Sequence, residues 1–224
     1  MVIAFVQSKS TQIAGTSSVN LSFDSPVTAG NCVVVFTTSW FYQSSGVTDN
    51  QSGNTYNSLV AIDAGAGNPH ARVFGTLNVA ASGTFTATVS FPGNADATII
   101  IAEFSGVATS GAAEVANTAA GTGTAVSVST SGATTDAGDA LVGIVTHDGS
   151  TMAITETYSL IAEQENNSSS QSGNAQYRLP GSIDTHALAW TMASSTGWIA
   201  AVVALKPAAG TSPARSMLAL LGAG

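Results

Sequence analysis

The residues that could do chemistry are few and scattered. Three histidines lie far apart, and none has a second histidine at metal-ligand spacing. His147 precedes Asp148 and Gly149, and a carboxylate could orient this histidine for proton transfer. Asp-Gly is a turn signal, so the sequence favours an ordinary junction between a strand and a turn. His70 follows Pro69 in a loop and His186 alternates within a strand, so we expect no metal site.

Other motifs are equally weak. Residues 49–54 (DNQSGN) resemble the oxygen-rich start of a calcium loop, but the acidic residue that closes such a loop is absent, which favours a polar hairpin turn. Glu103 is a carboxylate that lies in a cleft, faces solvent or pairs with an arginine. The sequence contains no nucleophile elbow, phosphate loop or dinucleotide turn. We therefore predict no enzyme activity and no cofactor.

The aromatic residues suggest a binding surface. Trp40 and Tyr42 end one strand, and an exposed aromatic platform there would suit stacking on a sugar ring. Aromatic residues at alternate strand positions more often belong to a core, so both interpretations remain open. Cys32 lies in an apolar run, where a small core side chain is favoured over a reactive thiol.

Composition narrows the class of protein. Of the 224 residues only 8% are charged, 44% are hydrophobic and 23 are glycines, so Ser, Thr, Asn, Gln and Gly must cover the surface. Five basic residues against 13 acidic ones give a net charge of -8, which argues against nucleic acid as a partner. No apolar run is long enough for a membrane span, and the N-terminus lacks an export signal. We therefore expect synthesis in a cytoplasm and no membrane partner.

Alternation of apolar and polar residues recurs along the chain and predicts an all-β protein. Runs such as 99–102 and 199–203 are apolar at every position, which suits strands buried on both faces. The predicted strands are residues 2–8, 18–24, 32–41, 55–63, 70–78, 84–91, 97–105, 125–131, 140–147, 158–165, 175–179, 185–192 and 198–205.

An internal repeat is the most informative feature. Residues 19–23 and 29–35 match residues 126–130 and 137–143, and the likeness continues from Thr55-Tyr56 to Thr157-Tyr158. Arg72 and Arg178 also align in this comparison, which predicts two structural clamps whose guanidinium groups bind carboxylates or loop carbonyls.

The repeat predicts two copies of one strand order, at about residues 18–107 and 125–207, joined by residues 108–124. We expect residues 1–207 to form one antiparallel, jelly-roll-like β-sandwich, because each copy has too few strong strands to cover both of its faces; two small sandwiches are the alternative. Residues 208–224 are predicted to be a linker and an apolar docking tail, which carries Met217, Leu218, Leu220 and Leu221.

The duplicated pattern resembles β-sandwich modules of phage virion surface proteins, tail fibres and bacterial surface proteins. The resemblance lies in Ala29-Gly30-Asn31 and Ala137-Gly138-Asp139 before apolar strands, in residues 47–56 and 102–107, and in the final pair of strands with their tryptophans. It covers about residues 18–207 and implies a fold but no catalytic residues.

A virion protein needs no export signal, because lysis releases it, and an apolar tail suits a subunit that docks into an assembly. The resulting hypothesis is a phage structural protein: a capsid decoration or cement protein that binds the major capsid protein or other virion proteins and stabilises the head. We expect a homo-oligomer, with a trimer as the simplest guess. The alternative is a tail-fibre or surface module that binds glycans through its loops and aromatic residues.

Overall fold

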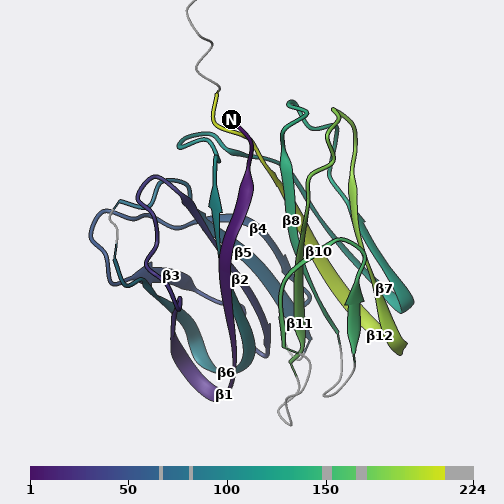
Figure 1. Ribbon diagram of the computed structural model, residues 1–224. Helices are drawn as coiled ribbons and strands as arrows, with labels where there is room; N and C mark the ends of the chain where they lie inside the picture. The colour runs from purple at the N-terminus through teal and green to yellow at the C-terminus, as the bar shows by residue number, and fades with distance from the viewer. Residues whose placement is uncertain (66–67, 81–82, 148–152, 165–170, 210–224) are drawn as a thin grey trace, which may run out of the picture.

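The computed structural model describes residues 1–65, 68–80, 83–147, 153–164 and 171–209 (Figure 1). These residues form antiparallel strands and no helix, which confirms the predicted all-β class. The first half contains β1 (Ala4–Ser22), β2 (Cys32–Trp40), β3 (Gly46–Asp49), β4 (Asn57–Asp63), β5 (Pro69–Thr76) and β6 (Thr86–Ser105). The second half contains β7 (Ala113–Ser129), β8 (Ala140–His147), β9 (Ile154–Glu156), β10 (Ser159–Gln164), β11 (Gly173–Arg178) and β12 (Ala187–Leu205).

The two halves have the same sheet topology. Strand order is β1-β6-β2-β5-β4 in the first sheet, with β3 paired to β6, and β7-β12-β8-β11-β10 in the second, with β9 paired to β12. Each strand of one half therefore has a counterpart in the other. This agreement confirms the two repeated halves that the sequence predicted.

The four longest strands run further than the sequence indicated. The strands predicted at residues 2–8 and 18–24 lie mostly within one continuous strand, β1, and β6 and β12 likewise each merge two predicted strands. Residues 113–124, which the sequence assigned to the joining segment, are the first part of β7 and pair with β12. Register shifts at their midpoints let these strands continue from one layer of a half into the other.

This continuity gives the molecule three cores. Val33 and Val35 of β2 face a core within the first half, together with Ala87 and Val89 from the start of β6. The alternate residues of β2 point the other way, into a core shared by both halves. The second half has its own inner core around Leu188, Trp190 and Met192. The two main sheets thus pack face to face, and the folded-over long strands also cover the outer face of each.

An approximate twofold axis runs along the strands between the halves. β1 lies against β10, and β4 lies against β7, and these two contacts exchange when the halves are exchanged. Thr38 and Thr146 occupy equivalent positions of β2 and β8, and both donate hydrogen bonds to the Ser172 carbonyl, at 3.2 and 2.6 Å. The arrangement is that of an isologous dimer joined into one chain.

A segment of the second half fills the space on this axis. The carbonyl of Gln171 accepts a hydrogen bond from Thr98 at 2.8 Å, so the segment before β11 is bonded to both sheets. Gly173 follows directly. A Cβ atom at this position would lie 2.9 Å from Thr98 Cγ2 and 3.1 Å from Thr38 Oγ1, so only glycine fits without displacement.

We predict that Gly173→Ala destabilises the chain by roughly 1–3 kcal/mol, because the two threonines it would contact are buried and hydrogen-bonded in place. Urea unfolding measures the change. Gly46→Ala, at a strand position with open space around the new methyl group, is the matched control. Equal stability of the two variants would contradict the packing described for the axis.

Candidate functional site

One end of the molecule gathers both ends of the described chain with several loops (Figure 1). The Met1 nitrogen donates a hydrogen bond to the Ala208 carbonyl at 3.0 Å, and Pro207 pairs with Val107. The loop after β7 lies beside them, since Gly138 is next to Pro207. The loop between β11 and β12 is joined to this loop by backbone hydrogen bonds. We call this the terminal end.

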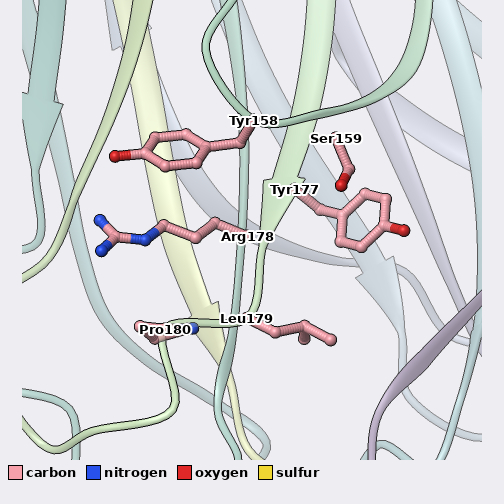
Figure 2. A pocket seen from close by; sticks show the side chains of 6 residues that line it. All are labelled: Tyr158, Ser159, Tyr177, Arg178, Leu179 and Pro180. Carbon is pink, nitrogen blue, oxygen red and sulfur yellow. The ribbon is translucent and has the colours of Figure 1, made fainter.

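The terminal end exposes large apolar side chains. Val2 is 78% exposed, Ile183 60% and Leu179 48%, and Met1 is exposed as well. Leu179 also lines a shallow hollow of about 460 Å³ at the end of β11. In Figure 2, Tyr158 and Arg178 extend to one side of the hollow, and Ser159, Tyr177 and Leu179 extend to the other.

The side chains around the hollow are held by packing. The Arg178 guanidinium lies over the Tyr158 ring, 4.7 Å from its centre, and donates to the Ala187 carbonyl at 3.1 Å. The Tyr177 ring stacks on Phe5 of β1, with ring centres 5.5 Å apart. The hollow is therefore a rigid surface feature.

Arg72 makes similar contacts in the first half. Its guanidinium lies over the Phe74 ring and donates to the Ser44 carbonyl at 2.9 Å and to Ser58 Oγ at 2.8 Å. The expectation that Arg72 and Arg178 occupy matching positions is wrong. Arg72 pairs with Thr37 on β2, whereas Arg178 pairs with the counterpart of Val33, four positions away. The Ala-Gly-Asn and Ala-Gly-Asp turns fix the register of the halves, and the arginines do not follow it.

The opposite end presents the last residue of β2 and the loop that follows it, residues 40–45, which we call the distal loop. Trp40 is half-buried and meets the Phe41 ring edge-on. Phe41 and Tyr42 are 52% and 43% exposed. The structure thus places Tyr42 at the surface, beside an exposed phenylalanine that the sequence analysis did not single out. Trp190, by contrast, is buried and donates to Asn174 Oδ1 at 2.9 Å.

Glu103 is neither solvent-facing nor paired with an arginine, so those two expectations are wrong. It is fully buried and accepts hydrogen bonds from Gln7 Nε2 and Asn31 Nδ2, both at 2.6 Å, and from the Thr28 backbone at 2.8 Å. These bonds tie β1 and the Ala-Gly-Asn turn to β6. The hydrogen bonds of this carboxylate are therefore made within the fold.

The second half bonds its corresponding turn to the sheet with different residues. Glu114 of β7 takes the place of Gln7, Asp139 that of Asn31, and Ala204 that of Glu103. Glu114 accepts bonds from the backbone and hydroxyl of Thr135 and forms an ion pair with Lys206 at 3.0 Å.

This substitution leaves two carboxyl groups side by side. Burial, together with the hydrogen bond and charge of Glu114, raises the pKa of Asp139 to about 6. Burial opposes ionisation of Glu114 as well, but hydrogen bonds from Asp139, Thr135 and Lys206 lower the pKa of Glu114 to about 2. The pair therefore shares one proton over the range between these values.

The other candidate residues from the sequence lie within strands, loops or the core. His70 is buried with its Nδ1 atom 2.9 Å from Asp63 Oδ1, and His147 ends β8, while Asp148 and Gly149 lie outside the described residues. Asp49 accepts hydrogen bonds from Gln51, Asn54 and Tyr56 within its own loop. Cys32 is fully buried, and burial raises the pKa of its thiol to about 12.

Within the described ranges no three His, Cys, Asp or Glu side chains converge to hold a metal ion. None of the residues that the structure describes form a helix able to cross a membrane. The predicted docking residues Met217, Leu218, Leu220 and Leu221 lie outside the described residues.

Comparisons of the chain with protein-family models, with curated proteins and with solved structures found no match.

The carboxyl pair predicts a pH dependence that one substitution removes. Because Asp139 keeps its proton up to about pH 6 in the folded state and loses it near pH 3.9 when unfolded, the free energy of unfolding falls as the pH rises through this window. Asp139→Asn supplies a donor to Glu114, as Asn31 does to Glu103. We expect this variant to gain stability over the wild type between pH 4.5 and 7.5, measured by urea unfolding.

Asn31→Asp is the matched control in the first half. It places a second carboxyl group beside Glu103 and should make stability fall more steeply as the pH rises over the same range. A difference between Asp139→Asn and the wild type that stays constant with pH would show that Asp139 and Glu114 are not coupled.

Proposed function

We propose that this chain is a structural subunit of a phage virion, a capsid decoration protein that docks on the outer shell through its terminal end. The observation that carries the proposal is that Val2, Leu179 and Ile183 are all exposed at the end of the molecule where the described chain ends. Large aliphatic side chains are costly to leave in water, and their grouping at one end marks a contact surface.

The composition of the chain supports docking at this end. Only 8% of the residues are charged, so the protein offers little for electrostatic recognition, and apolar contact must provide most of the binding energy. A stable interface buries about 800 Å² on each partner. The described residues end at this end of the molecule, and the apolar residues 217–221, the predicted docking tail, follow them in the sequence.

The use of the acidic residues supports a role without catalysis. Glu103 and Asp49 are bonded within the fold, and Glu114 and Asp139 hold a turn. Rigidity of this kind suits a cement subunit. Binding that favours the assembled shell stabilises it by an amount that grows with the logarithm of the free concentration relative to Kd, about 4 kcal/mol per site at 1,000 Kd.

The test is re-binding of purified protein to particles from which this chain has been removed. The double variant Leu179→Ser with Ile183→Ser should bind at least tenfold more weakly than the wild type, because two exposed apolar contacts become polar. Phe41→Asn, at the opposite end, is the control and should bind normally. Equal binding by all three proteins would contradict docking through the terminal end.

A further inference from the structure

The distal loop contains a strained backbone turn. Phe41 has φ of 73°, and the Tyr42 amide donates to the Trp40 carbonyl at 3.0 Å. A positive φ at the central residue and a hydrogen bond between the first and third residues define a form of the γ-turn that is rare in proteins. A bulky aromatic residue is among the least suited to positive φ, since its Cβ crowds the backbone. Asparagine or glycine would relieve the strain, yet a phenylalanine is present.

Polar contacts hold the loop in this conformation. Ser39 Oγ donates to the Tyr42 carbonyl at 2.6 Å, and Thr37 Oγ1 lies 2.7 Å from Ser44 Oγ. Arg72 donates to the Ser44 carbonyl at 2.9 Å, and the Ser45 amide donates to the Ser90 carbonyl at 2.8 Å. The loop is therefore bonded to β2, β5 and β6. Strain persists where surrounding contacts over-determine a conformation, and such positions cluster at binding sites.

The two aromatic rings are presented to solvent from this rigid base. The Tyr42 ring lies against Gly93, where a Cβ atom would come within 2.8 Å of ring carbons. Because Gly93 has no side chain, the Tyr42 ring can pack directly on its backbone. Phe41 is more than half exposed and is braced edge-on by Trp40. A preorganised aromatic surface binds without the entropic cost of ordering its side chains.

The chemistry of the surroundings selects the ligand. Aromatic faces attract the polarised C–H groups on one face of a hexose ring. Asp96 is the cross-strand neighbour of Trp40. Its Oδ1 accepts a hydrogen bond from the Gly15 amide at 2.8 Å, and its other oxygen can accept one from a sugar hydroxyl group. The net charge of -8 and this carboxylate both disfavour sialylated, sulfated or phosphorylated sugars.

We propose that the distal loop is a carbohydrate-binding site for neutral hexose oligosaccharides, with Phe41 and Tyr42 as the stacking platform and Trp40 and Gly93 as its supports. β2 separates this loop from the terminal end by about 26 Å of strand. A subunit docked by one end would therefore present the glycan site outward. The site does not depend on the proposed shell docking, because the two surfaces share no residue.

The experiment measures binding of the full chain to an array of neutral, sialylated and sulfated oligosaccharides, followed by titration of the best neutral sugar. Phe41→Asn should reduce affinity tenfold or more without lowering the urea midpoint, because asparagine tolerates positive φ. A merely structural Phe41 would show the reverse pattern. Gly93→Ala keeps every aromatic residue but displaces Tyr42, and should also weaken binding.

Leu179→Ser with Ile183→Ser is the control and should bind the sugar normally while losing attachment to particles. Failure of the glycan site is thus distinct from failure of shell docking. The proposal is overturned if no neutral oligosaccharide binds, if only charged sugars bind, or if Phe41→Asn and Gly93→Ala bind as tightly as the wild type.

Discussion

The face-to-face packing of the two main sheets, related by a half-turn about an axis along the strands, governs the rest of this structure. It buries β2 and β8 on both faces, so these strands are apolar over their first five or six residues and carry only hydroxyl side chains and His147 among their buried polar groups. It also requires the long strands to fold over and cover the outer faces. Where the halves meet on the axis, the Ser172 carbonyl accepts hydrogen bonds from one threonine of each sheet, Thr38 and Thr146. Gly173 packs closely against Thr98 and Thr38.

The halves have diverged within this constraint by exchanging residues between partner positions. The first half places Glu103 on β6 and amides around it, whereas the second places its carboxylate on β7. Elsewhere Gly121 and Trp198 of the second half stand where the first has Ile13 and Ala97, and the indole packs directly on the glycine. Each exchange conserves a local function, bonding a turn or filling a volume, while changing the strand that provides it.

These exchanges explain how much the sequence could show. Strand content, the buried central strands and the duplication follow from alternation and from the two Ala-Gly turns. The strand at residues 113–124 could not be predicted, because its small residues show little alternation of apolar and polar side chains. These residues form a strand only by pairing with β12. Glu103 could not be placed because its partners come from β1 and from the loop after it, far away in sequence. Arg72 and Arg178 aligned in the sequence because both are arginines, but they pair with positions of the central strands that are not equivalent.

The distal loop shows a different limit. Trp40 and Tyr42 suggested an aromatic platform in the sequence, but periodicity could not separate a core position from an exposed one at a strand end. The positive φ of Phe41 depends on bonds from Ser39 and Arg72, which only the folded chain brings together. The two surfaces give the molecule a polarity, with an apolar terminal end for attachment and a rigid aromatic end facing away.

The most direct test of this account is the number of copies of this chain in purified virions, counted by quantitative mass spectrometry against the most abundant coat protein. A decoration subunit predicts a ratio near one or a simple fraction or multiple of it. Complete absence from the particles, or a handful of copies per virion, would contradict attachment to the shell.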